Sequence, residues 1–297
     1  MNVASQVPLP DLCAQGGSPA PDLTIEFSAG NPPAPDELLC DWGGRYGLRL
    51  SRSGRDRVFT SAFEGAIAVS SDGRKIRVTA PRLPIGRGLH DILVRRVLPR
   101  VATLFDAAAI HAASIANDGR GLLLYGPSGA GKSTMTAALS RAGWNVLSDD
   151  ISIIRGADEA RIEPCTTGIC VWTDTQSALG LEAERCETMA GYDGKVRYLG
   201  TSPAPALGAS LAACVTLERD PLIGSPALER LGSSDGIKSI IQQLILFNPN
   251  GLPDERLPPI EAAVATVSEV PFFRLRYPSG FAALAEAEIL LRQLLGG

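Results

Sequence analysis

The feature that most constrains the fold is a glycine-rich turn between an apolar run and a segment with helical spacing. Residues 126–133 are Gly-Pro-Ser-Gly-Ala-Gly-Lys-Ser, which matches the phosphate-loop pattern G-x-x-x-x-G-K-[ST]. The apolar run 121–125 predicts a strand buried on both faces, and residues 132–143 predict a helix that ends at Gly143. A strand, this turn and a helix in this order predict an α/β fold.

The residue types of this turn suit it to bind phosphate. Glycines let the backbone turn so that successive N–H groups point at phosphate oxygens, and the start of a helix attracts the same anion. Lys132 can neutralise the β- and γ-phosphates, and the Ser133 hydroxyl can hold Mg²⁺. We therefore expect ATP and Mg²⁺ as cofactors, bound by the loop residues Gly126, Pro127, Ser128, Gly129, Ala130, Gly131, Lys132, Ser133 and Thr134.

Two adjacent carboxylates, Asp149 and Asp150, follow the apolar segment 145–148, only 17 residues after Lys132. A crossover helix fits this gap, and strands of one sheet deliver their carboxyl ends to one crevice, where ligands bind. One carboxylate is enough to hold Mg²⁺, so two suggest that the other accepts a proton from an attacking hydroxyl. The alternative is a helix cap or a solvated turn.

His111 is one of only two histidines, and it lies at the start of a predicted strand, 110–116. A lone histidine at a strand edge is more often structural than catalytic, so the residues alone leave both roles open.

Composition narrows the classes of protein that the chain can represent. It has 297 residues, of which 45% are hydrophobic, and 28 Lys+Arg against 32 Asp+Glu give a net charge of −4, which is globular composition. No basic block favours nucleic acid as a partner, and no apolar run is long enough to span a membrane. The start lacks the features of a signal peptide, so we expect a cytoplasmic protein. Six cysteines without a CxxC motif disfavour a zinc site and indicate reduced thiols.

The pattern along the chain predicts two domains. Residues 1–36 are rich in proline, with room for one short strand at 23–27, and alternating runs between 46 and 80 predict half-buried antiparallel strands. We therefore expect a small β-rich region over 1–85 and a larger α/β domain over 86–297 that carries the phosphate loop. In the larger domain the pattern predicts strands at 110–116, 145–155, 211–219 and 272–277 and helices at 91–105, 234–247 and 280–295.

The stretch IHAASIANDGRGLLLYGPSGAGKSTMTAALSRAGWNVLSDD resembles the core of the HPr kinase/phosphorylase family. The shared features are the order of a His-containing strand, a hairpin, the phosphate loop, a helix and a strand that ends in Asp-Asp. The resemblance is specific over 110–155, weaker to 219 and absent before about 85. It implies a P-loop kinase core akin to phosphoenolpyruvate carboxykinase, phosphorylation of a serine on a carrier protein, and a homo-oligomer.

The resemblance also implies residue roles. Asp149 corresponds to the family's acid/base, Asp150 to a magnesium ligand beside Ser133, and His111 to the active-site histidine, while Lys132 contacts phosphate. The family's glutamate-bearing signature is not recognisable after the Asp pair, where IEPCTTGICVWTD (162–174) stands instead. Glu163 is the candidate for the missing glutamate.

The chain is more similar to the divergent HPr-kinase-like proteins that accompany ribosomal peptide biosynthesis, some of which phosphorylate the C-terminal serine of a lasso-peptide precursor. The segment YDGKVRY (192–198) resembles one in these relatives. Lys195 and Arg197 lie two apart, so on a strand they would face one side and could meet phosphate or a peptide carboxylate. Two solvated charges on a loop are the alternative.

These features together favour an ATP- and Mg²⁺-dependent kinase that acts on a serine hydroxyl of a peptide or small protein. A small-molecule kinase is one alternative. A nucleotide-binding regulatory module without phosphotransfer is another, which the Asp pair disfavours because binding alone needs no base.

Overall fold

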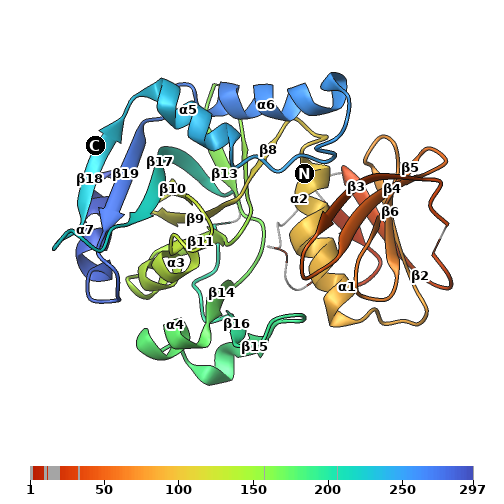
Figure 1. Cartoon of the computed structure of the whole chain (residues 1–297), viewed down its shortest axis with the longest axis horizontal. Coiled ribbons are helices and arrows are strands. Elements are labelled where there is room, and N and C mark those ends of the chain that lie inside the picture. The colour runs from red at the N-terminus through yellow and green to blue at the C-terminus, as the bar shows by residue number, and fades with distance from the viewer. Residues whose placement is uncertain are drawn as a thin grey trace. The chain divides into compact units, whose positions relative to one another are not determined.

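The computed structural model describes residues 3–9, 12, 21–32, 34–156, 158–205 and 207–296, so most of the proline-rich start lies outside it. The chain forms two compact units (Figure 1). The first comprises residues 1–106 and 246–259, and the second comprises 107–245 and 260–297. The sequence pattern predicts a boundary near residue 85, whereas the first unit continues for a further helical segment and takes in a piece of chain from much later in the sequence.

A seven-stranded sheet forms most of the first unit, in the order β1-β2-β7-β6-β5-β4-β3. The strands β3 to β7 form an antiparallel meander, and β2 joins it by parallel pairing with β7. The strands are β1 Val3–Ser5, β2 Leu23–Ala29, β3 Glu37–Gly43, β4 Leu48–Ser53, β5 Asp56–Thr60, β6 Ala66–Val69 and β7 Lys75–Ala80. The alternating runs between 46 and 80 therefore form the predicted antiparallel strands, while β3 was not predicted.

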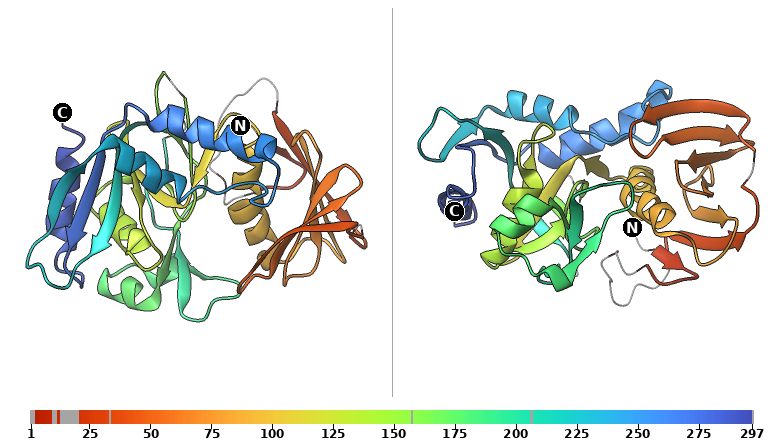
Figure 2. Two further views of the ribbon diagram at one scale, coloured as in Figure 1. Left: turned by 45° about the horizontal axis from the view of Figure 1, so that its top comes forward. Right: turned by 60° about the horizontal axis from the view of Figure 1, so that its bottom comes forward.

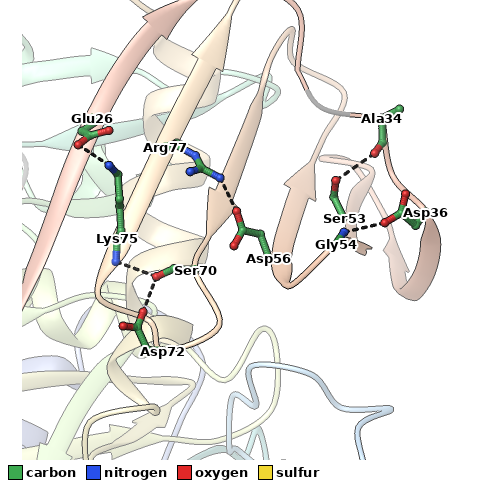
Figure 3. Close-up of polar contacts among 10 residues, drawn as sticks. All are labelled: Glu26, Ala34, Asp36, Ser53, Gly54, Asp56, Ser70, Asp72, Lys75 and Arg77. Atoms are coloured by element: carbon green, nitrogen blue, oxygen red, sulfur yellow. Dashed lines mark hydrogen bonds and ion pairs between the residues drawn. The ribbon is translucent and has the colours of Figure 1, made fainter.

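Charged side chains link strands of this sheet at its surface (Figure 3), between the neighbours β2 and β7 and between β7 and β5 across β6. The Lys75 ammonium lies 2.7 Å from the Glu26 carboxylate, and Arg77 pairs with Asp56. Exposed ion pairs of this kind contribute at most about 1 kcal/mol each. The stability of the unit must therefore come mainly from its apolar core.

That core includes the helical segment α1 (Arg87–Ile92), η1 (Leu93–Val97, one π-helical turn) and α2 (Leu98–Ala102). The segment confirms the helix predicted at 91–105 but begins four residues earlier. Its buried apolar side chains pack against the sheet and are Leu89, Ile92, Leu93, Val97, Leu98 and Val101. Phe247 joins them from the distant piece of chain, with its ring 5.5 Å from that of Phe59 in an edge-to-face arrangement. This packing is the reason why the first unit extends beyond residue 85.

The second unit is built on a nine-stranded mixed sheet with the order β11-β9-β10-β17-β13-β12-β8, to which β19 and β18 add beside β17. Strands β10, β17 and β19 run parallel, and β9 is antiparallel to both β10 and β11. The strands are β8 Ala108–Ile110, β9 Ala112–Asn117, β10 Arg120–Tyr125, β11 Asn145–Ser148, β12 Ser152–Arg155, β13 Arg161–Glu163, β17 Ala209–Arg219, β18 Ala227–Leu231 and β19 Phe272–Tyr277.

Helices cover both faces of this sheet (Figure 2). Leu122 and Leu124 of β10 pack in a cluster with α3 (Lys132–Arg141) and α7 (Leu284–Gln293). Leu123 and Tyr125 point to the other face and pack in a cluster with α5 (Ser233–Ile241) and the end of α6 (Pro253–Val267). The prediction that 121–125 is a strand buried on both faces is confirmed.

A second, three-stranded sheet extends this unit beside α3, in the order β14-β16-β15. Its strands are β14 Ile169–Trp172, β15 Cys186–Thr188 and β16 Lys195–Tyr198, accompanied by α4 (Thr173–Ala178) and the short turn η2 (Ala183–Arg185). Ile169 and Val171 pack with Ala137 of α3 and Val146 of β11. The small sheet is therefore fixed next to the helix that follows the glycine-rich turn.

Some helices differ from the sequence-based expectation. The helices expected at 234–247 and 280–295 are shorter at 233–241 and 284–293, and α6 was not predicted because it contains Pro258 and Pro259. In the part of the chain that the structure describes, no helix is both long and apolar enough to cross a membrane.

Candidate functional site

Two strands that the sequence pattern predicts as continuous are each broken in the middle. The run 110–116 divides into β8 and β9 at His111, and the run 145–155 divides into β11 and β12 at 149–151. β8 pairs with β12 and β9 pairs with β11, so the two breaks face each other across the sheet. The residues that the sequence singled out, His111, Asp149 and Asp150, all lie at these breaks.

The glycine-rich turn joins β10 to α3 as predicted. Gly126, Gly129 and Gly131 have φ values of +140°, +83° and +92°, which L-residues with side chains rarely adopt. A Cβ on Gly126 would lie 2.9 Å from the Leu217 carbonyl oxygen of β17, so the loop lies close against the neighbouring strand. Gly131 caps the N-terminus of α3, a helix of ten residues, which leaves the first helical N–H groups at the loop.

Lys132 lies across the loop. Its ammonium donates hydrogen bonds to the carbonyl oxygens of Gly126 at 2.9 Å and Pro127 at 3.3 Å. Burial lowers the pKa of Lys132, and the charge of Lys195 lowers it further. The carboxylates of Asp150 and Asp149 act in the opposite direction on this pKa. The loop lysine therefore lies within electrostatic reach of both aspartates and of a second lysine.

Asp149 is buried and holds two elements together. Its Oδ1 accepts a hydrogen bond from the Ser133 hydroxyl at 2.9 Å, and its Oδ2 accepts one from the Cys170 N–H at 2.8 Å. Only 2% of Asp149 is exposed, and a carboxylate at such a position needs hydrogen bonds to offset its lost hydration. The structure thus brings Asp149 into direct contact with the loop serine.

Asp150 points elsewhere. Its φ is +76°, a left-handed conformation that Asp tolerates better than most residues, and its side chain is 31% exposed. Its Oδ1 lies 3.4 Å from Nε2 of His111, at the break between β8 and β9. His111 and Asp150 therefore form a partly exposed polar pair beside the buried Asp149.

The predicted substrate residues differ in environment. Lys195 and Arg197 project from the same face of β16 as expected, but Arg197 is buried and pairs with Glu187 at 2.6 Å. The Lys195 ammonium lies over two rings, 5.1 Å from that of Tyr192 and 5.9 Å from that of Trp172. Trp172 is half exposed, so Lys195 lies in a partly open aromatic site.

Oxygen and cation chemistry at this edge of the sheet fits Mg-ATP. The loop amides and Lys132 suit phosphate, and the Ser133 hydroxyl beside the Asp149 carboxylate offers the hard oxygen ligands that Mg²⁺ prefers. Mg²⁺ commonly takes one or two protein ligands together with substrate phosphates. Among the described residues no three His, Cys, Asp or Glu side chains converge as a metal site, and this mode of Mg²⁺ binding does not require it.

Other contacts at the site were not evident from the sequence. The Cys170 N–H, the rings of Trp172 and Tyr192, and the Tyr277 hydroxyl all approach it from distant parts of the chain. A backbone donor leaves no sequence signal, whereas the aromatic residues near Lys195 could have been noticed. Glu163, the candidate for the missing glutamate, pairs with Arg155 at 2.9 Å, and its role at the site stays a prediction.

Comparison with known proteins finds similarity to solved structures only by their folds. No protein-family model matches the sequence, and no curated protein matches it. The HPr(Ser) kinase/phosphatase from Coxiella burnetii, a solved structure, is similar at 13% identity and a TM-score of 0.32, over 62% of this chain and 94% of that one. A likeness this distant carries neither fold nor activity over to the chain, so the site must be judged by its own contacts.

The lowered pKa of Lys132 predicts how this residue reacts. A neutral amine is the nucleophile, so Lys132 should be acylated at lower pH in the folded protein than in the same chain unfolded in urea. The chain has only four lysines (75, 132, 195 and 238), so mass spectrometry of peptides can follow each separately over a pH series. Added Mg-ATP should raise the pH at which Lys132 is half-acylated, because phosphate charge stabilises the ammonium. If Lys132 is half-acylated at the same pH in the folded and the unfolded protein, the prediction of a buried loop lysine is wrong.

Proposed function

We propose that the chain is an ATP- and Mg²⁺-dependent kinase that transfers the γ-phosphoryl group to a serine hydroxyl of a peptide or small protein. The observation that carries the proposal is the meeting of three features at one edge of the sheet. These are the phosphate loop, the buried Ser133–Asp149 contact and the His111–Asp150 pair. A phosphate cradle needs only the first, whereas phosphoryl transfer also uses a metal-binding carboxylate and a base.

In this proposal the loop amides and Lys132 hold the β- and γ-phosphates, while Ser133 and Asp149 hold the metal. Mg²⁺, when bound, supplies positive charge that neutralises the phosphate oxygens during transfer. The Cys170 N–H fixes the second oxygen of Asp149, so the carboxylate is oriented before any ligand arrives. This support from outside the ligand set is typical of metal-binding carboxylates.

Asp150 serves as the base. Its carboxylate accepts the serine proton as the serine oxygen bonds to the γ-phosphorus and the bond from that phosphorus to the β–γ bridging oxygen breaks, which releases ADP. His111 orients Asp150 and can share the proton. The resemblance-based assignment was the reverse, with Asp149 as base and Asp150 as metal ligand, and both assignments remain proposals. The contact of Asp149 with Ser133 and its burial favour Asp149 as the metal ligand.

The acceptor class comes from the sequence resemblance. It supports a peptide or carrier-protein serine, including the C-terminal serine of a lasso-peptide precursor as the most specific version. The proposal is tested by incubating the protein with Mg-ATP and peptides encoded beside its gene, and by weighing the products. We expect a gain of about 80 Da for one phosphate. Lys132→Ala, which removes the loop cation from a folded protein, should abolish the gain.

Each alternative predicts a distinct result in this assay. ATP consumption that needs an added small alcohol but no peptide would favour a small-molecule kinase. ATP binding without any consumption would favour a regulatory module.

The two aspartates should have separable effects when each is replaced by asparagine. Asp150→Asn cannot accept the proton, so kcat should fall by about 10²–10⁴-fold while the Mg²⁺ concentration for half activity stays near that of wild type. Asp149→Asn weakens a metal ligand and should raise that Mg²⁺ concentration. Measurement of both quantities on one peptide decides between the two assignments. The opposite pattern would restore Asp149 as the base, and equal defects would reject any division of roles.

We further propose that Lys195 is a second cation for the transferred phosphate. Its ammonium is held by Trp172 and Tyr192 and its charge acts on Lys132, so an anion between the two lysines would stabilise both. Arg197, which is buried with Glu187, stays a predicted substrate contact only.

Lys195→Gln should lower kcat by about 10²–10³-fold, as is typical when one donor to developing charge is lost. Lys238→Gln is the matched control, because Lys238 is exposed on α5 and interacts with Asp235 at 3.8 Å. Equal activity of the two variants would reject the proposed role of Lys195 in binding the transferred phosphate.

A further inference from the structure

The peptide between Ala130 and Gly131, inside the phosphate loop, is held from the side of the protein core. The hydroxyl of Tyr277, the last residue of β19, donates a hydrogen bond to the Ala130 carbonyl oxygen at 2.5 Å. Tyr277 is only 2% exposed, and its ring packs in the same apolar cluster as α3 and α7. The contact joins residues 147 apart in the sequence.

Strand pairing explains how so distant a residue reaches the loop. β19 runs parallel to β17, and β17 runs parallel to β10, so the three strands end at the same edge of the sheet. β10 leads directly into the loop, β17 ends at Arg219, and Arg219 pairs in register with Tyr277. The hydroxyl is thus supplied by the same edge that carries the proposed site.

The contact leaves no room for the loop to shift toward the core. A Cβ on Gly131 would lie 2.2 Å from the Tyr277 hydroxyl oxygen and 2.9 Å from the Arg219 guanidinium. Burial raises the pKa of Tyr277, and Arg219 opposes this only in part, so the phenol keeps its proton at neutral pH and remains a donor.

Because the peptide is planar, a bond to the Ala130 oxygen also fixes the direction of the Gly131 N–H. In a trans peptide the C=O and the following N–H point in opposite directions. A hydroxyl fixed on the Ala130 oxygen therefore directs the Gly131 N–H away from Tyr277 and the core. Without that bond the peptide could rotate, because Gly131 has wide conformational freedom.

We propose that Tyr277 is a positioning residue for the phosphate loop, whose buried hydroxyl directs the Gly131 amide at the β-phosphate of the nucleotide. The inference rests on the proposed nucleotide site. It adds a residue from the last strand of the sheet that touches neither phosphate nor acceptor.

The test compares two buried tyrosines that each lose one hydroxyl. Tyr277→Phe removes the bond to the loop and the hydrogen bond with the Arg219 side chain, and it keeps the ring. Tyr125→Phe is the matched control, because its hydroxyl lies 2.8 Å from that of Ser239 on α5 and makes no bond to the loop. We expect Tyr277→Phe to weaken Mg-ADP binding by about 10-fold in calorimetry, the effect of losing one well-aligned hydrogen bond to a charged group. Tyr125→Phe should bind Mg-ADP as wild type does.

A second readout separates positioning from general stability. Tyr277→Phe should raise KM for ATP by a similar factor while KM for the peptide stays unchanged, and both variants should lose a similar amount of thermal stability. Equal Mg-ADP affinities of the two variants would overturn the inference, and so would a Tyr277→Phe protein that fails to fold, since the hydroxyl would then serve the fold itself. Failure of the wild-type protein to bind Mg-ADP would instead reject the nucleotide site.

Discussion

The buried carboxylate of Asp149 joins three elements of the second unit. It accepts hydrogen bonds from the Ser133 hydroxyl of α3 and from the Cys170 N–H of β14, and it lies directly after β11. A buried carboxylate that lost either donor would be left with an unpaired lone pair, which is costly in a low-dielectric interior. The Asp149 carboxylate therefore joins helix, main sheet and small sheet, in addition to the apolar packing of Ile169 and Val171 against α3 and β11.

Asp149 and Asp150 show how one backbone torsion can direct two neighbouring side chains of the same type into different environments. In a continuous strand their side chains would alternate between faces of the sheet. In this fold β11 ends, Asp150 takes a left-handed conformation, and its carboxylate turns to His111 at the facing break between β8 and β9. One aspartate becomes buried and hydrogen-bonded to two elements, whereas its neighbour stays partly exposed beside His111.

Local patterns in the sequence predicted the parts of the fold that local forces determine. The glycine-rich turn between β10 and α3 forms as expected, and so does the hairpin between β9 and β10, with positive φ at Asp118 and Gly119. The helix after the glycine-rich turn ends at Arg141, two residues before the predicted end at Gly143. The pattern did not show that 110–116 and 145–155 are broken, because apolar residues resume directly after His111 and after Asp150, and the breaks are defined by pairing between distant strands. Helix α6 escaped prediction for a different reason, since Pro258 and Pro259 argue locally against a helix that tertiary packing supports.

The difference between local patterns and long-range pairing also explains why the groups that hold the loop from β14 and β19 were not predicted. The loop itself is a local motif, but the groups that hold it come from β14 and β19, which reach it only through strand pairings of long sequence separation. β19 joins the sheet by parallel pairing with β17, a kind of contact that brings a large loop-closure entropy. The Ala130–Gly131 peptide consequently receives its hydrogen bond from Tyr277 only after the last strand has been added. A local sequence motif thus specifies the glycine-rich turn after β10, while the completed sheet supplies the hydroxyl that holds its Ala130–Gly131 peptide.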